Sequence, residues 1–320
     1  MRSKQNSNGT GRPCRIKKYS MGVKGLYNYL KQYRNDIDPR QLPPKRIGVD
    51  AMSLLYKHRG DFAKILILLQ SLREAGHRIF FVFDGKPPVE KEREIQVRKN
   101  QKSEAQTKAT VIQTFLESEA AIDMDISAKD LLQYSLGRLQ NQSWHMTRDL
   151  RRAFQEELWI AEIPYVKSVS EADDVLVDLV NGGKLDVVLS TDMDYLLSGV
   201  QTLWVPTTKG LFQFEELSLD SILRGEGLTE IGFLDAGLLC GTEERHGAQG
   251  IPCIQAFTLS RHYGCLEGIL DSAVKDPVVR AMFPDMEAVI AARATAAPNE
   301  AYSRIRPDHL IRVKDFLDSL

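Results

Sequence analysis

The stretch SVSEADDVLVDLVNGGKLDVVLSTDMDYLL, from Ser168 to Leu197, joins two short acidic clusters through apolar runs. Apolar residues recur at helical spacing in its first half, which predicts an amphipathic helix. The opening turn of that helix carries Glu171, Asp173 and Asp174, and Ser170 is its expected N-cap. The stretch therefore begins with a helix whose first turn is acidic.

A short strand is expected in the second half of this stretch. After the break at Asn181–Gly183, the run Leu185–Leu189 is apolar and of the length that forms a parallel strand buried on both faces. The run leads into Asp192, and Asp194 lies just beyond it. A helix followed by a buried strand indicates an α/β fold.

The acidic opening turn has two explanations that this segment alone does not separate. Ser170 followed by Asp173 fits a capping box, and carboxylates are favoured at the N-terminus of a helix in any case. The same carboxylates would suit a metal site. A repeated pattern elsewhere in the chain favours the metal site.

Two further hydrophobic strands are expected to end at an aspartate. IGVD covers Ile47–Asp50, and IFFVFD covers Ile79–Asp84. In open α/β sheets the binding site lies beyond the carboxyl ends of the strands, where these aspartates would meet Asp192. Unpaired carboxylates in such number would repel one another, and a hard divalent cation removes that repulsion. Mg²⁺ suits oxygen-only ligands and is commonly shared with substrate phosphates.

The composition allows a sizeable core but does not identify the chemistry. The 320 residues are 43% hydrophobic, enough for one large α/β domain with a helical annex or for two modest domains. The 42 basic and 43 acidic residues nearly cancel, so a nucleic-acid partner would have to be held by local patches. No membrane span or secretion signal is recognised, so no membrane partner is expected. The cysteines lack ligand spacing, which favours a reducing compartment and no zinc: Cys14, Cys240, Cys253 and Cys265.

Three regions are expected along the chain. Residues 1–20 are polar with only basic charges, and form either a disordered tail or a misassigned start ahead of Met21. Residues 21–225 form the α/β core. Within them, residues 88–160 begin with a charge-dense run, which on composition alone would be a solvated helix. The rest of this region has helical signals and no alternating strand, so residues 88–160 are interpreted as a helical insertion. Residues 226–320 are expected to be mainly helical.

Two features follow the acidic stretch. Thr202–Thr207 and Leu211–Phe214 are expected to form a strand pair. Gly247–Gly264 resembles a helix-hairpin-helix turn, in which backbone amides of a glycine-containing hairpin approach a phosphate. A plain loop between helices explains the same residues equally well.

Six motifs occur in order along the chain. They are MGVKGL from Met21, VDAMSLLY around Asp50, VFDGKPP at Asp84, SEADD at Glu171, STDMDYL at Asp192 and FLDAGLLCGTE ending at Glu243. Together they resemble the flap endonuclease family of XPG-like structure-specific 5′ nucleases. The resemblance implies a three-layer α/β/α PIN-like nuclease core with a mainly parallel sheet. It also implies a helical arch for a single-stranded 5′ end and a C-terminal helix-two-turn-helix region that grips duplex DNA.

The resemblance implies roles for individual residues. The family's seven metal-binding positions fall on Asp50, Asp84, Glu171, Asp173, Asp192, Asp194 and Glu243. The catalytic set is Lys91, Arg98 and Asp192, in which the two cations match basic arch residues that act on the scissile phosphate. DNA contacts are implied for Gly22, Lys24, Tyr56, Gly247, Gly250 and Ile251. Tyr56 matches an aromatic that stacks on a base, although an aromatic in an apolar helix is otherwise more often part of the core.

The implied chemistry is hydrolysis of DNA phosphodiester bonds with two Mg²⁺ ions, with Mn²⁺ as an alternative. Ions about 4 Å apart can activate a water and stabilise both the attacking and the leaving oxygen. Lys91 and Arg98 would neutralise charge that grows on the phosphate. The implied partner is 5′-flap or branched or nicked duplex DNA, in replication, repair or recombination. The chain is expected to act as a monomer in the nucleus, or at a viral replication site if a virus encodes it.

The chain departs from the family pattern at several points. Asp173 stands where a glutamate is usual and Glu243 where an aspartate is usual, so each carboxylate moves by one methylene. Pro252 replaces the second glycine of the usual hairpin and lacks a backbone donor, which affects potassium-assisted duplex gripping. The segment Lys314–Leu320 lacks the family's sliding-clamp peptide, so no clamp tether is expected.

Two other functions are consistent with the same motifs. One is a catalytically inactive relative that serves as a nucleic-acid-binding scaffold. The other is a 5′ exonuclease or junction resolvase of the same superfamily. The intact acidic set and both arch cations favour an active nuclease over a scaffold.

Overall fold

The computed structural model describes residues 23, 25–87, 92–122, 124–241 and 251–275. Contacts divide the chain into two compact units. One unit comprises the described residues of Met1–Tyr29 and Leu223–Glu300, and the other comprises those of Leu30–Ile222. Each unit is described by itself.

The larger unit is built on one mixed sheet. Within the described residues its seven strands are β1 (Arg34–Ile37), β2 (Arg46–Asp50), β3 (Arg78–Phe83), β4 (Tyr165–Lys167), β5 (Val187–Leu189), β6 (Thr202–Pro206) and β7 (Phe214–Ser218). They lie in the order β1-β7-β6-β5-β2-β3-β4. Only β7 is antiparallel to its neighbours β6 and β1, whereas the remaining pairs are parallel. The predicted mainly parallel α/β fold is confirmed.

Helices account for most of the remaining described chain. In the larger unit they are α2 (Ala51–His58), α3 (Phe62–Glu74), α4 (Glu92–Leu116), α5 (Ile126–Ser143), α6 (Arg148–Ile160), α7 (Ala172–Asn181) and α8 (Asp194–Leu197). α9 (Leu219–Glu226) runs across the boundary, and the smaller unit holds α1 (Leu26–Tyr29), α10 (Glu230–Cys240), α11 (Cys253–Tyr263) and α12 (Leu266–Lys275). Short 3₁₀ turns are η1 (Leu30–Tyr33), η2 (Pro39–Gln41) and η4 (Glu119–Ala121). None of these described helices is long and apolar enough to span a bilayer.

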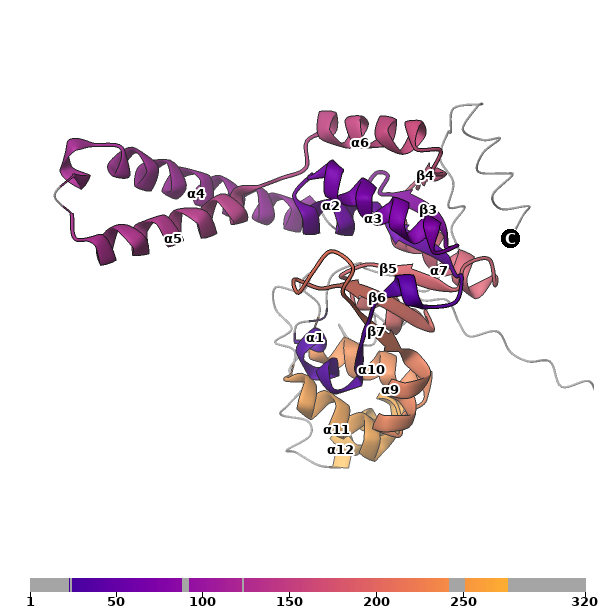
Figure 1. Ribbon diagram of the computed structural model, residues 1–320. Helices are drawn as coiled ribbons and strands as arrows, with labels where there is room; N and C mark the ends of the chain where they lie inside the picture. The colour runs from indigo at the N-terminus through magenta and orange to yellow at the C-terminus, as the bar shows by residue number, and fades with distance from the viewer. Residues whose placement is uncertain (1–22, 24, 88–91, 123, 242–250, 276–320) are drawn as a thin grey trace, which may run out of the picture. The chain divides into compact units, whose positions relative to one another are not determined.

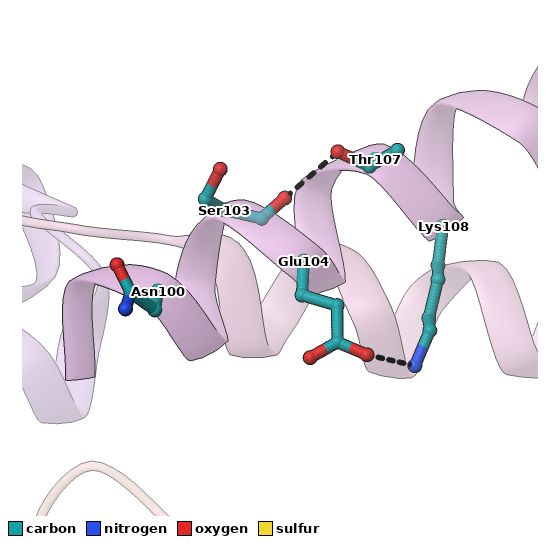
Figure 2. A pocket seen from close by; sticks show the side chains of 5 residues that line it. All are labelled: Asn100, Ser103, Glu104, Thr107 and Lys108. Atoms are coloured by element: carbon teal, nitrogen blue, oxygen red, sulfur yellow. Dashed lines mark hydrogen bonds and ion pairs between the residues drawn. The ribbon is translucent and has the colours of Figure 1, made fainter. Parts of the chain in front are cut away.

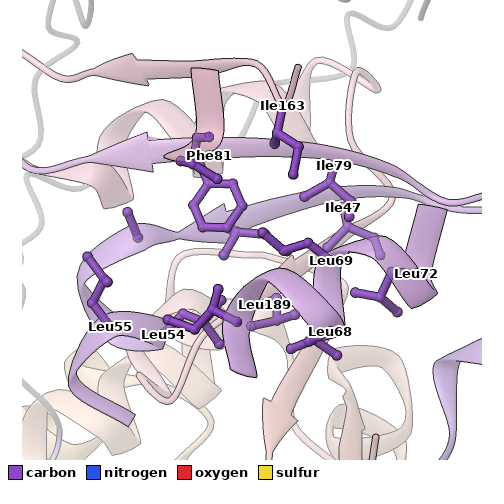
Figure 3. Packing of buried hydrophobic residues seen from close by; sticks show 14 of the residues in the cluster. Ile47, Leu54, Leu55, Leu68, Leu69, Leu72, Ile79, Phe81, Ile163 and Leu189 are labelled. Atoms are coloured by element: carbon purple, nitrogen blue, oxygen red, sulfur yellow. The ribbon is translucent and has the colours of Figure 1, made fainter. Parts of the chain in front are cut away.

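The two faces of the central strands are covered by different helices. Ile47 and Val49 belong to a buried cluster with side chains of α2 and α3, as Figure 3 shows for Ile47 beside α3. Gly48 faces the other way, where a Cβ would lie 2.6 Å from the side chains of both Leu176 and Leu185. A larger residue at this position would therefore require both leucine side chains to move. The larger unit is therefore layered as helix, sheet and helix, as predicted.

α6 is fixed on the same core by one aromatic residue. The Phe154 ring is fully buried, and its centroid lies 5.2 Å from that of Phe62 in α3 and 5.7 Å from that of Phe81 in β3. Its neighbour Leu158 is also fully buried. The helical insertion thus returns to the sheet through an apolar anchor before β4 begins.

α4 and α5 lie side by side as a long hairpin that projects from the sheet (Figure 1). Most side chains of α4 are exposed, as its charge-dense sequence predicts. Ala105 and Ala109, one helical turn apart, are buried, with 5% and 2% of their surface exposed. Small residues at this spacing allow the two helices to approach closely. The predicted helical insertion is therefore present between β3 and β4.

The smaller unit packs α1 against the later helices, a grouping that the sequence did not suggest. The Tyr29 ring lies 4.3 Å from that of Phe257 in α11. The Tyr29 hydroxyl donates to the buried Glu226 carboxylate over 2.9 Å, and Arg261 donates to the same carboxylate. The buried Asp235 carboxylate accepts the backbone N–H of Leu266, the first residue of α12. The first set of contacts joins α1, α9 and α11, and the second joins α10 to α12.

Some predicted boundaries differ from the observed ones. The expected strand Leu211–Phe214 is wrong for its first three residues, because β7 begins at Phe214. The expected N-cap Ser170 is also wrong, since α7 starts after Glu171 and the Ser170 hydroxyl instead donates to Asp174 over 2.6 Å. β1 was not predicted from the sequence.

Candidate active site at the carboxyl edge of the sheet

The described members of the predicted acidic set lie where the strand order reverses. From β2 the chain builds outward through β3 and β4, and then crosses to the other side of β2 to begin β5, β6 and β7. The carboxyl ends of β2 and β5 therefore flank a switch point, which is where open α/β sheets bind ligands. Asp50 is the last residue of β2, and Asp192 follows β5.

Asp50 is contacted by three groups, which come from α2, from the loop after β5 and from α8. Its Oδ1 accepts the backbone N–H of Ser53 over 3.0 Å, so the residue that ends β2 also caps α2. Its Oδ2 accepts the Ser190 hydroxyl over 3.0 Å, and the Tyr195 hydroxyl lies 3.5 Å away. Only 8% of the Asp50 surface is exposed. The carboxylate is therefore buried with its orientation fixed.

Asp84 connects β3 to the acidic helix. Its Oδ1 accepts the backbone N–H of Ala172, the first residue of α7, over 2.9 Å. The next residue, Gly85, donates its N–H to the Ser170 carbonyl over 2.6 Å. A side chain cannot fit at Gly85, because a Cβ would lie 2.1 Å from the Ser168 carbonyl oxygen. This close approach places Asp84 next to the opening turn of α7.

That opening turn carries two of the predicted metal ligands. Glu171 is the N-cap residue but makes no side-chain cap, and the side chain of Asp173 is buried in the first turn. The N–H of Ala172 is instead capped from another strand by Asp84. The capping-box explanation therefore does not describe this helix.

Asp192 and Asp194 lie on the loop that follows β5. The Asp192 N–H donates to the Ser190 hydroxyl over 3.1 Å, and Asp192 Oδ1 accepts the Asp194 N–H over 2.9 Å. The Thr191 and Ser53 hydroxyl oxygens lie 2.8 Å apart and join this loop to the start of α2. Hydroxyl groups thus tie the end of β5 to the end of β2.

Burial and mutual charge both perturb the ionisable groups of this cluster. Burial raises the pKa of the Asp50 carboxyl well above its usual value, and the negative charges of Asp84 and Asp173 raise this pKa further. Burial also raises the pKa of the Tyr195 hydroxyl, as do the charges of Asp173 and Asp50. These shifts indicate that the acids are close enough to interact in a region of low dielectric. Such a cluster is stabilised by protons or by a bound cation.

The carboxylates are individually oriented rather than arranged around one point. Within the described ranges, no three His, Cys, Asp or Glu side chains are positioned to hold a metal ion. The hydrogen bonds of Asp50, Asp84 and Asp192 to protein groups account for their present orientations. The donor set nonetheless suits a hard divalent cation, since it consists of carboxylate oxygens that repel one another.

A basic and aromatic group lies at the base of the α4–α5 hairpin. The Lys102 ammonium is 4.8 Å from the centroid of the Tyr56 ring and 3.4 Å from its hydroxyl oxygen. Trp144, at the end of α5, packs edge-on against Tyr56 with centroids 5.2 Å apart. Tyr56 is 41% exposed, so it is not a core aromatic. Arg98 is exposed one turn before Lys102 on α4.

Several predicted residues cannot be placed. Lys91, Glu243, Gly22, Lys24, Gly247 and Gly250 lie outside the described residues. Ile251 is described and is 9% exposed, and its N–H donates to the Leu239 carbonyl over 3.1 Å. The amide of Ile251 is therefore engaged within the protein.

Sequence reasoning missed the hydroxyl and aromatic partners of the predicted residues. Ser190 and Tyr195 contact Asp50, and Trp144 and Lys102 contact Tyr56. Ser190 and Tyr195 lie beside Asp192 and Asp194 in the sequence, which was the available signal. Nothing in the sequence pairs Trp144 with Tyr56.

An open hollow on α4 is not a second candidate. Figure 2 shows that its lining side chains all come from one helix. Lys108 pairs with Glu104, and the Thr107 hydroxyl donates to the Ser103 carbonyl. Asn100 accepts a hydrogen bond from Gln96. These polar groups are engaged by their own helix, and the hollow contains none of the predicted site residues.

Sequence comparison finds flap endonucleases. A family model described as XPG I-region matches residues 162–243, which include the acidic stretch. Flap endonuclease 1-B of Physcomitrium patens is 31% identical over 292 residues, covering 83% of this chain and 78% of the relative. Flap endonuclease 1 of Glossina morsitans morsitans is 31% identical over 276 residues, covering 78% of this chain and 68% of the relative.

Solved structures share the fold. The catalytic core of Rad2 in complex with DNA substrate has a TM-score of 0.59 at 17% identity, covering 93% of this chain and 94% of the other. Flap endonuclease-1 from Methanococcus jannaschii has a TM-score of 0.52 at 21% identity, covering 93% of each chain. At these identities the likeness concerns the fold alone.

Proposed function

The chain belongs to the flap endonuclease family, and we propose that it hydrolyses DNA phosphodiester bonds at 5′ flaps or at branched or nicked duplex ends. The observation that carries this proposal is the acidic cluster at the switch point of the sheet. There burial raises the pKa of the Asp50 carboxyl, and the charges of Asp84 and Asp173 raise it further. Clustered buried acids are costly for stability alone, so they favour a catalytic metal site over a scaffold.

We propose divalent-metal dependence with Mg²⁺ as the ion and Mn²⁺ as a substitute. Asp50, Asp84, Glu171 and Asp173 would hold one ion, and Asp192, Asp194 and Glu243 would lie mainly toward a second. A pair of such ions would activate a water and stabilise the oxygens that attack and leave the phosphorus. Oxygen-only donors in a buried, mutually repelling set support this choice of metal.

The remaining residues would bind and position the DNA. Arg98 and Lys91 would neutralise the charge that develops on the scissile phosphate, and loss of one such contact costs roughly 3 to 4 kcal/mol in the transition state. Tyr56 would stack on a base near the cleavage point, supported by its exposed ring and by the adjacent Lys102 ammonium. The region around Gly247, Gly250 and Ile251, with Gly22 and Lys24, would contact DNA.

We further propose that the protein acts as a monomer without a sliding-clamp tether. Its site of action would be the nucleus, or a viral replication site if a virus encodes it. Its role would lie in DNA replication, repair or recombination.

A cleavage assay on defined DNA structures tests the proposal. The full chain is incubated with 5′-flap, nicked, blunt and four-way-junction DNA, in Mg²⁺ or in EDTA. We expect Mg²⁺-dependent cleavage at the flap junction and none in EDTA. Asp192→Ala should abolish cleavage while retaining DNA binding, and Arg98→Ala should lower the rate about a hundredfold to a thousandfold. Glu74→Ala, at an exposed position of α3, should cleave normally. Cleavage in EDTA, or normal activity of Asp192→Ala, would contradict the proposal.

A further inference from the structure

Tyr195 is a core aromatic side chain that contacts the acidic cluster. It lies in α8, one residue after Asp194, and none of its surface is exposed. A polar hydroxyl is costly to bury unless it forms a hydrogen bond. The Tyr195 hydroxyl therefore needs a hydrogen-bond partner, and two acidic residues lie close enough to be one.

The Tyr195 hydroxyl lies between carboxylates that come from different elements. It donates a hydrogen bond to Asp173, in the first turn of α7. The same oxygen is 3.5 Å from Asp50 Oδ2, at the end of β2. Ser190 donates to that Asp50 oxygen over 3.0 Å. Two hydroxyl groups thus contact the buried side of Asp50, and one of them also bonds to Asp173.

This arrangement opposes a specific instability. Asp50 and Asp173 repel each other, and carboxylate side chains can rotate to increase their separation. The Tyr195 hydroxyl is carried by a rigid ring that is held in the core. Rotation of the Asp173 carboxylate would break its hydrogen bond to this hydroxyl, so the hydroxyl restricts that rotation. Flexible side chains such as serine restrict it less.

We propose that Tyr195 is a positioning residue that fixes Asp173 relative to Asp50 and thereby sets the affinity of the site for divalent cations. It would act through the carboxylates, without contacting the ion or the DNA. The inference rests on the proposed function, because it assumes that these carboxylates hold a cation. Residues that orient metal ligands through hydrogen bonds commonly affect metal affinity by about tenfold or more.

Tyr195→Phe is the direct variant, because it removes the hydroxyl and keeps the ring. Tyr29→Phe is the matched control: its hydroxyl also donates to a buried carboxylate, that of Glu226, in the smaller unit. Mn²⁺ binding to the full chain without DNA is measured by electron paramagnetic resonance. We expect Tyr195→Phe to bind Mn²⁺ about tenfold more weakly and Tyr29→Phe to bind it like the wild type.

A double-variant cycle separates positioning from a general loss of stability. In an Asp173→Asn background, Tyr195→Phe should cause no further loss of Mn²⁺ affinity, since the contact is already altered. Melting temperatures in EDTA should fall by a similar amount for Tyr195→Phe and Tyr29→Phe. If Tyr195→Phe binds Mn²⁺ with wild-type affinity, or if its effect is unchanged by Asp173→Asn, Tyr195 only fills the core and the inference is overturned.

The same measurements distinguish this failure from failure of the proposed function. If wild type binds Mn²⁺ and cleaves flap DNA while Tyr195→Phe is indistinguishable from it, only the inference fails. If wild type neither binds Mn²⁺ nor cleaves DNA, the metal-dependent nuclease proposal fails and the inference fails with it.

Discussion

Asp50 connects secondary structure to chemistry within one side chain. It ends β2, caps α2 through the Ser53 amide, and shares a buried region with Asp84 and Asp173. A neutral side chain could form the same cap without charge repulsion. The charge at this position is therefore better explained by ligand binding than by folding.

The raised pKa of Asp50 predicts how stability of the metal-free protein depends on pH. Folding raises this pKa from its ordinary value of 3.8, so the folded protein binds a proton more tightly than the unfolded chain. Stability from this group is fully present below pH 3.8 and is lost as the pH rises through the folded pKa. In EDTA, raising the pH through the folded pKa should therefore lower the melting temperature of the wild type more than that of Asp50→Asn.

Mg²⁺ provides the control for that titration. A cation that neutralises the cluster should raise the melting temperature of the wild type at neutral pH, and raise that of Asp50→Asn less. If the melting temperatures of the two proteins changed with pH in the same way in EDTA, the repulsion assigned to Asp50 and its neighbouring carboxylates would be contradicted.

Individual site residues differed in how far the sequence could predict them. Asp50, Asp84 and Asp192 were recognisable because each follows an apolar strand. Tyr195 was not recognisable, because a tyrosine within an apolar segment is normally part of the core. The contacts of its hydroxyl arise only when α7 and β2 bring Asp173 and Asp50 close to it. Contacts between distant segments carry no signal of this kind in one sequence.

At the scale of elements, the contact between the β3–α4 loop and the segment before α7 depends on Gly85. A Cβ there would meet backbone carbonyl oxygens of Ser168 and Val169, at 2.1 and 2.5 Å, which cannot move independently. Gly85→Ala should therefore displace Asp84 from the opening turn of α7. We expect a loss of about 2 kcal/mol in stability and about tenfold weaker Mn²⁺ binding.

Gly137→Ala is the matched control, because nothing lies within 4 Å of a Cβ at that position in α5. Alanine is the better helix former, so the control should be as stable as the wild type or slightly more stable. Urea unfolding and Mn²⁺ titration measure both effects. Wild-type Mn²⁺ affinity in Gly85→Ala would disprove the role given to this glycine.

The polar contacts of Glu226 are expected to stabilise the smaller unit. Its side chain is 1% exposed and accepts hydrogen bonds from Tyr29 and Arg261. Glu226→Gln removes the charge while keeping the shape, and should cost about 2 kcal/mol, since the Arg261 side chain is 39% exposed and partly screened.

The exposed pair of Glu104 with Lys108 on α4 supplies the control. Both side chains are more than 60% exposed, so Glu104→Gln should change the free energy of unfolding by less than about 0.5 kcal/mol. Chemical denaturation of the two variants compares them directly. Equal losses would show that burial of Glu226 contributes little.

Elements with regular apolar patterns were predicted well from the sequence, and short polar ones were not. β2 and β3 are continuous apolar runs and were placed within one residue. β1 has the sequence RNDI and lies at the edge of the sheet, where polar side chains reach solvent, so it lacks a strand pattern. Its pairing with β7 depends on tertiary structure alone.

At the scale of the whole molecule, the order of the strands determines where the acids meet. The alternation of strands and helices predicted a mainly parallel sheet, and the aspartates predicted a site at its carboxyl edge. One sequence does not specify that β5 lies beside β2 rather than beside β4. That crossover brings Asp192 to the same edge as Asp50.

The grouping of α1 with the helices that follow the sheet was likewise not predictable from local patterns. α1 precedes the sheet in the chain, yet Tyr29 packs against Phe257 in the smaller unit. The sequence between them contains all seven described strands. Long-range packing of this kind depends on complementary surfaces, which periodicity does not encode.

We propose that acids from separate strands bind divalent cations for phosphodiester hydrolysis. Anomalous scattering from crystals of the full chain grown with Mn²⁺ and 5′-flap DNA tests it most directly. The account predicts Mn²⁺ bound by the carboxylates of Asp50, Asp84, Asp173 and Asp192, next to a phosphate of the DNA. Absence of Mn²⁺ from these carboxylates, at a concentration that supports cleavage, would contradict it.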